Sequence, residues 1–131
     1  MIDAGLLTKV TAESVHFGNM DQIDSARDQM LRVTNVFETG EEVTDQESLF
    51  RVLAATLKFP EYFGGNWDAV VDCLRDVQAI GARRGLVLVL HHARVLWREA
   101  PECAGTLVET WLSVAEERRG SDEPFHLVFV W

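Results

Sequence analysis

The sequence predicts a small α/β protein in which helices cover a parallel β-sheet. Three short apolar runs, at residues 31–37, 85–90 and 125–131, have the length and composition of strands. The second run is apolar at successive positions, which is typical of a strand buried on both faces. Two stretches with helical periodicity separate each neighbouring pair of runs, and parallel crossover connections need this spacing.

Length and composition favour one folded, acidic domain. A chain of 131 residues fits a single core, and 47% apolar with 25% charged residues is close to the average of soluble globular proteins. The formal net charge is -9, so a phosphate backbone would be repelled. We therefore expect a cationic protein partner and no nucleic acid.

The N-terminus and the cysteines indicate a cytoplasmic protein. Asp3 stands where a secretory signal needs basic residues, and no apolar run approaches the length of a membrane span, so we expect no membrane association. Cys73 and Cys103 have no C-x-x-C or Cys/His metal spacing. We interpret them as reduced structural thiols, with a disulfide as the open alternative. No motif in the sequence predicts a metal or another cofactor.

The first half of the chain contains one clear helix. Residues 1–30 are the least distinctive part, with a possible helix from Met20 to Met30. The clear helix begins at Thr44, where Glu47 completes a capping box, and it carries leucines at every fourth position. Pro60 marks its end.

A glycine-containing loop leads into a second helix. The paired glycines at 64 and 65 permit tight turns, and Asn66 is placed to cap a helix that runs from Trp67 to about Val77. A later helix, from about residue 106 to residue 119, ends in two arginines and a glycine, as helix C-termini do.

Aspartates line one side of the helix that begins at Trp67. Asp68, Asp72 and Asp76 follow at i, i+4 and i+8, roughly opposite the apolar face. Like charges at this spacing destabilise a helix by about 0.2 to 0.5 kcal/mol per pair. The helix dipole explains Asp68, which lies in the first turn, but not the other two. Arg75 can reach Asp72 and offset part of the repulsion, so a merely solvated acidic face remains an alternative.

The loop and this helix carry a recognisable motif. Pro-Glu-Tyr, an aromatic residue, Gly-x-Asn, Asp-Ala and Asp-Cys-Leu follow in order within residues 59–74. This stretch closely resembles the signature of the barstar family of ribonuclease inhibitors, and weaker similarity extends from about residue 33 to residue 131. Residues 1–30 have no counterpart in the shorter family members. We therefore divide the chain into an N-terminal extension of uncertain structure, 1–30, and a barstar-like domain, 31–131.

The resemblance implies both a fold and a function. It implies a three-stranded parallel sheet flanked by helices, and insertion of the loop and helix into the catalytic cleft of a small basic ribonuclease. Asp72 matches the family's dominant binding aspartate, Asp68 a second contact carboxylate, and Tyr62 the contact aromatic of the loop. A carboxylate on a rigid helix can take the charge-assisted hydrogen bonds that the enzyme gives a phosphate. We expect a monomer until the complex forms.

Several positions depart from the family pattern. Val71 stands where the inhibitor that named the family has a tryptophan, and Arg75 and Asp76 replace small neutral residues, so we expect the partner surface to differ there. A further family glutamate falls near Val114, where Glu116 or Glu117 could substitute. The residues expected to bind the partner are Tyr62, Asn66, Asp68, Val71, Asp72, Arg75 and Asp76.

Two other function classes remain open from the sequence. His91 and His92 follow a buried strand, which is a common place for catalytic groups in α/β enzymes. Adjacent histidines on a strand end point to opposite sides, and no nucleophile or phosphate-binding motif completes a site. The other class is a barstar-fold interaction domain or immunity protein whose partner is not a ribonuclease.

Overall fold

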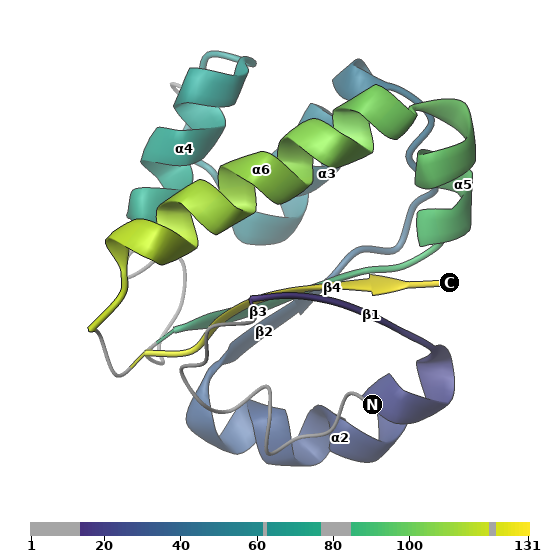
Figure 1. Cartoon of the computed structure of the whole chain (residues 1–131), viewed down its shortest axis with the longest axis vertical. Helices are drawn as coiled ribbons and strands as arrows, with labels where there is room; N and C mark the ends of the chain where they lie inside the picture. Colours follow the sequence, from purple (N-terminus) through teal and green to yellow (C-terminus); the bar gives the residue numbers. More distant parts are fainter. Residues whose placement is uncertain (1–13, 62, 77–84, 121–122) are drawn as a thin grey trace.

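The computed structural model describes residues 14–61, 63–76, 85–120 and 123–131, and its centre is a four-stranded parallel sheet. The strands are β1 (Val15–Gly18), β2 (Asn35–Glu38), β3 (Leu86–Leu90) and β4 (Phe125–Val130). They lie in the order β1-β4-β3-β2, and every neighbouring pair is parallel (Figure 1). The predicted α/β class is confirmed, but the predicted count of three strands is wrong. The additional strand is β1, a four-residue segment at one edge of the sheet.

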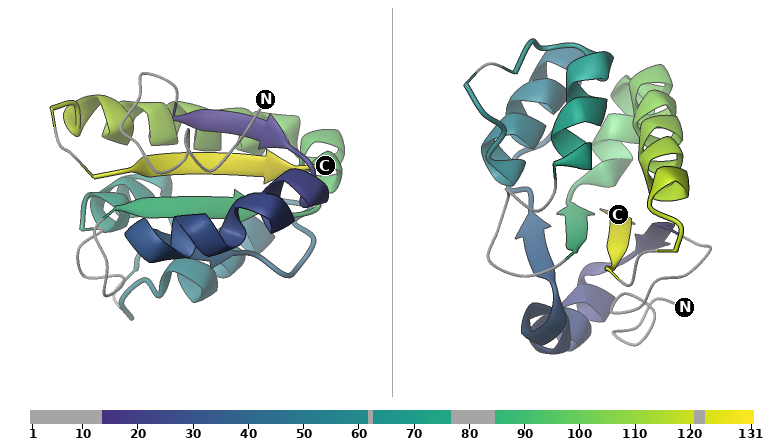
Figure 2. Two further views of the ribbon diagram at one scale, coloured as in Figure 1. Left: turned by 90° about the horizontal axis from the view of Figure 1, so that it is seen from below. Right: turned by 90° about the vertical axis from the view of Figure 1, so that its left-hand side faces the viewer.

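Helices cover both faces of the sheet, as the apolar character of β3 requires. Helix α2 (Met20–Val33) lies on one face, and α3 (Gln46–Leu57), α4 (Trp67–Arg75), α5 (Ala93–Glu99) and α6 (Pro101–Glu117) lie on the other (Figure 2). The two predicted helices between β2 and β3, and the two between β3 and β4, are confirmed. Within the described ranges, every helix is too short or too polar to cross a membrane.

Three predicted boundaries are wrong for local reasons. Residues 31–33 form the last turn of α2, so the first predicted strand begins only at Asn35. Asp45, not Thr44, caps α3, because its carboxylate accepts the Ser48 N–H at 2.7 Å while the Ser48 hydroxyl accepts the Asp45 N–H. The last helix begins at Pro101, since proline is well suited to the first turn.

The two faces of the sheet bury two separate apolar clusters. Leu86, Leu88 and Leu90 of β3 point toward α3, α4, α5 and α6, and these helices supply most of the larger cluster. The alternate residues Val87 and Val89 point the other way. Together with residues of β4 they pack against the buried side of α2, in a cluster of Ile23, Ala26, Met30, Val87, Val89, Val128 and Val130. All positions of β3 and β4 are therefore buried.

Gly85 brings the starts of three strands together. Its φ of 79° lies in the left-handed region, and the next residue, Leu86, donates its N–H to the Pro124 carbonyl at 2.8 Å. The Asn35 side chain donates to the Gly85 carbonyl at 2.8 Å. A Cβ at position 85 would lie 2.5 Å from the Pro124 carbonyl oxygen, which is closer than real Cβ atoms come.

We expect Gly85→Ala to lower the free energy of unfolding by about 1 to 3 kcal/mol, because the new methyl group meets backbone in a strained conformation. Gly40→Ala is the matched control, since a Cβ at Gly40 meets nothing within 4 Å. We expect the control to change stability by no more than about 0.5 to 1 kcal/mol. Urea denaturation measures both variants, and equal effects would contradict the close contact at Gly85.

Candidate protein-binding site

Helix α4 separates an apolar face from an acidic one. Val70, Cys73 and Leu74 are buried against the core, whereas the three aspartates at 68, 72 and 76 are exposed. The Asp72 side chain is 76% exposed. The separation of an apolar from an acidic face is therefore confirmed; the helix ends at Arg75 with Asp76 as its C-cap, and Val77, the predicted end, lies outside the described part. We refer to Asp68, Asp72 and Asp76 as the acidic face.

Asn66 fixes the start of α4. Its Oδ1 accepts the Ala69 N–H at 2.8 Å, and its backbone carbonyl accepts the Val70 N–H at 3.1 Å. Gly65, immediately before it, has a φ of 67°, which glycine adopts without strain. The predicted cap is confirmed, so Asn66 has a structural role whatever else it contacts. Asp68 lies in the first turn, where the helix dipole stabilises a carboxylate.

Aromatic side chains attach the loop and the start of α4 to α3. The Phe50 ring lies 4.9 Å from Trp67 and 6.0 Å from Phe63, both edge to face, and Phe63 lies 5.0 Å from Phe59. Trp67 Nε1 also donates to Gln46 Oε1 at 3.1 Å. These contacts pack the start of the acidic helix against α3. Tyr62, the contact aromatic implied by the family motif, lies outside the described residues.

A bidentate ion pair joins α4 to α6 beside the acidic face. Arg75 Nε and Nη2 donate to the two carboxylate oxygens of Glu117 at 2.8 and 2.6 Å, and Arg75 Nη1 lies 3.4 Å from Asp72 Oδ1. The hydrogen bonds from Arg75 hold the pKa of Glu117 below its ordinary value, and those to Glu117 raise the pKa of Arg75. The sequence spacing predicted the contact between Arg75 and Asp72. It did not predict the stronger pair of Arg75 with Glu117, because these two residues are 42 positions apart.

The structure distinguishes the candidate residues of the penultimate helix. Val114, where the family glutamate falls, is fully buried and cannot reach a partner. Glu116 pairs with Arg119 at 2.7 Å, whereas Glu117 extends toward α4. Val71, which replaces the family tryptophan, is half-buried and packs against the core.

Asp76 ends α4, where an acidic charge opposes the helix dipole. Its N–H donates to the carbonyls of Asp72 and Cys73, while its side chain is exposed. A carboxylate at a helix C-terminus is unfavourable because the last carbonyls carry partial negative charge. Helix stability therefore does not account for the charge at this position.

The histidines that the sequence suggested as a catalytic site lie after the end of β3, where His91 forms a hydrogen-bonded contact with a charged side chain. His91 Nε2 lies 2.8 Å from Glu38 Oε1, and Arg27 donates to both oxygens of the same carboxylate at 2.7 and 2.9 Å. His92 is exposed, has a φ of 58° and precedes α5. Both histidines follow the end of β3 at Leu90, and their environments differ: His91 bonds to Glu38, whereas His92 is exposed. Across the described ranges, there is no cluster of His, Cys, Asp or Glu that could hold a metal ion.

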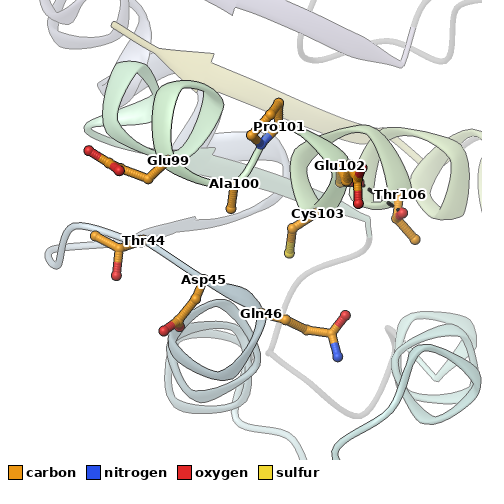
Figure 3. Close-up of a pocket in the computed structure, with 9 residues that line it drawn as sticks. All are labelled: Thr44, Asp45, Gln46, Glu99, Ala100, Pro101, Glu102, Cys103 and Thr106. Carbon is orange, nitrogen blue, oxygen red and sulfur yellow. Dashed lines mark hydrogen bonds between the residues drawn. The ribbon is translucent and has the colours of Figure 1, made fainter.

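Both cysteines, Cys73 and Cys103, are free thiols. Cys103 lines a hollow of about 520 Å³ between the start of α3 and the junction of α5 and α6 (Figure 3). Burial raises the pKa of Cys103, and the charge of Asp45 raises it further. Burial likewise raises the pKa of Cys73. Both thiols are therefore poor nucleophiles. The polar side chains of the hollow include Asp45, which caps α3, and Thr106, which bonds its own helix.

Fold and site together define a small α/β protein that presents an acidic helix, packed against α3 and α6, on one side of its sheet. The chain belongs to the Barstar family, because the family model described as barstar (barnase inhibitor) matches residues 33–130. The family predicted from the motif is thereby confirmed. The match begins at the last residue of α2, so β1 and most of α2 precede it. No curated protein matches the chain.

Replacing Asn66 with alanine should lower the free energy of unfolding by about 1 kcal/mol, because the Ala69 N–H loses its acceptor. Asn66→Asp keeps an acceptor of the same reach, so we expect it to retain most of this stability. Thermal melting followed by circular dichroism measures both variants. Equal losses for alanine and aspartate would show that the cap does not hold the helix.

The Arg27–Glu38–His91 group predicts a dependence of stability on pH. Hydrogen bonds from Arg27, followed by that from His91, hold the pKa of Glu38 below its ordinary value of 4.5. A lowered folded-state pKa stabilises the protein above about pH 4.5 and loses this effect as the pH falls through the lowered value. The difference in the free energy of unfolding between the wild type and Glu38→Gln should therefore become smaller as the pH falls below about 4.5. Urea denaturation measures this difference, and a value that stays constant from pH 7 to pH 3 would contradict the prediction.

Proposed function

We propose that this protein inhibits a small basic ribonuclease by inserting α4 and the loop before it into the catalytic cleft. The observation that supports this proposal is the position of Asp72. It is a largely exposed carboxylate in the second turn of a rigid helix, and its weak contact with Arg75 does not account for its presence. Two further aspartates repel it, so helix stability alone disfavours the arrangement.

The chemistry of a ribonuclease supplies a reason for such a carboxylate. An enzyme that cleaves RNA gathers cationic side chains around the scissile phosphate. Asp72 can accept charge-assisted hydrogen bonds from these cations in place of the phosphate. Asp68 and Asp76 extend the negative field on either side, which favours fast association with a basic cleft.

The remaining contact residues are proposed from the family motif and their positions. Tyr62 and Asn66 precede α4, and Val71 and Arg75 lie along it. Val71 offers less surface than the tryptophan of the founding inhibitor, so the partner must fill that space differently. We further propose an immunity-type protein that acts in the cytoplasm and is monomeric until it binds its enzyme.

A second candidate is an interaction domain whose partner is not a ribonuclease. The bidentate pair formed by Arg75 and Glu117 favours it, because it places a fixed cation on a surface that should meet a basic enzyme. Titration against nuclease toxins of other classes separates the two candidates. Catalysis at His91 is disfavoured, because no nucleophile or phosphate-binding motif in the sequence completes a site around it.

The test is a titration of the purified protein against a panel of small basic ribonucleases, with RNA cleavage as the readout. We expect stoichiometric inhibition of at least one enzyme, and a loss of about 2 to 5 kcal/mol of binding free energy in Asp72→Ala. The variant should melt at an equal or higher temperature than the wild type, since it loses a repulsion and gains a better helix former.

Two control substitutions complete this test. Asp76→Ala should slow association more than it speeds dissociation, and Glu42→Ala, outside the acidic face, should change inhibition little. Full inhibition by Asp72→Ala would refute the phosphate-mimicking role. Lost inhibition together with a collapsed melting temperature would make Asp72 a structural residue instead.

A further inference from the structure

Arg75 places a cation directly beside the carboxylate that the proposed function relies on. On α4, Arg75 lies three residues after Asp72, which puts the two side chains on neighbouring positions of the helix surface. The Arg75 side chain is 51% exposed, so burial does not confine it. An unrestrained arginine at this spacing pairs with the aspartate and competes with any cation that a partner brings.

Glu117 determines where the guanidinium lies. It receives two donors, Nε and Nη2, in a fork geometry at 2.8 and 2.6 Å, whereas Asp72 receives one donor at 3.4 Å. Bidentate pairs of arginine with carboxylate are the stronger and more directional kind. The α6 helix therefore holds Arg75, and Asp72 remains 76% exposed.

We propose that Glu117 is a positioning residue: by taking the two short hydrogen bonds of Arg75 it limits Arg75 to one long contact with Asp72, and so keeps Asp72 available to the cations of the partner. This inference rests on the proposed function, with Asp72 as the principal binding carboxylate. It differs from a direct role for Glu117, because Glu117 acts through Arg75. It also differs from a purely structural tie between α4 and α6, because its effect appears in binding.

The first experiment uses the free protein and needs no partner. In the wild-type background, Asp72→Asn should leave the melting temperature unchanged or raise it. In the Glu117→Gln background, Arg75 loses its short hydrogen bonds to Glu117 and its long contact with Asp72 tightens, so the same substitution should lower the melting temperature by about 1 to 2 °C. The same response of Asp72→Asn in both backgrounds would overturn the proposal, because it would show that the contact between Arg75 and Asp72 does not tighten when Glu117 loses its charge.

The second experiment measures affinity for a ribonuclease that the wild-type protein inhibits. Glu117→Gln should bind about tenfold more weakly, since a released cation then faces a basic cleft. Glu109→Gln is the matched control, because it removes the same charge from an exposed position on α6, and it should bind within about twofold of the wild type. The double variant Arg75→Gln/Glu117→Gln should bind at least as tightly as the wild type.

The double variant decides between the possible roles of Glu117. An equal loss of affinity with and without Arg75 would overturn the proposal in favour of a direct contact between Glu117 and the partner. Unchanged affinity in Glu117→Gln would also overturn it. If the wild type inhibits no ribonuclease, the proposed function fails, while the melting experiment still decides whether Glu117 restrains Arg75.

Discussion

Burial of β3 and β4 on both faces is the constraint on which the rest of the structure depends. Strands that are apolar at every position need helices above and below them, and α2 and the group α3 to α6 meet this need. Once Val70 and Leu74 of α4 are committed to the core, the acidic face must point to solvent, because the helix leaves it no other direction. The aromatic contacts of Phe50 then fix the start of α4 and the approach of the loop. The geometry of the site thus follows from the packing of the sheet.

The molecule uses its charges in two contrasting ways. At the ends of β2 and β3, Glu38 is half-buried and surrounded by Arg27 and His91, so its hydrogen-bonding capacity is spent inside the protein. On α4, Asp72 keeps most of its surface and most of its capacity for hydrogen bonds. A carboxylate that bonds to cations of its own protein, such as Glu38, stabilises the fold. An exposed carboxylate with acidic neighbours, such as Asp72, contributes mainly to binding, when a cation of a partner protein reaches it. This difference separates Asp72 from Glu38.

Periodicity and capping rules predicted the features that depend on local sequence. The parallel sheet, the paired helices between its strands, the Asn66 cap and the acidic face of α4 all follow from patterns within about ten residues. Strand β1 gave little signal, because it has four residues at the sheet edge and its buried position, His16, is polar. The first predicted strand began too early because the apolar side chains of residues 31–33 belong to the last turn of α2. The pairing of Arg75 with Glu117 depends on how two helices pack, and no spacing rule connects residues so far apart.

The strand order has a consequence for how the chain acquires its structure. Strand β4, the last of the four along the sequence, lies between β3 and β1, and the buried His16 on β1 bonds to His126 on β4, 110 residues away. Until β4 is in place, β3 keeps an open edge and β1 has no neighbour in the sheet. The native sheet thus needs contacts between residues near the two ends of the chain, and contacts of such high sequence separation slow folding. A nascent chain that stops before residue 125 already contains α3, α4 and α6, but it lacks Phe125, on which Trp111 of α6 stacks.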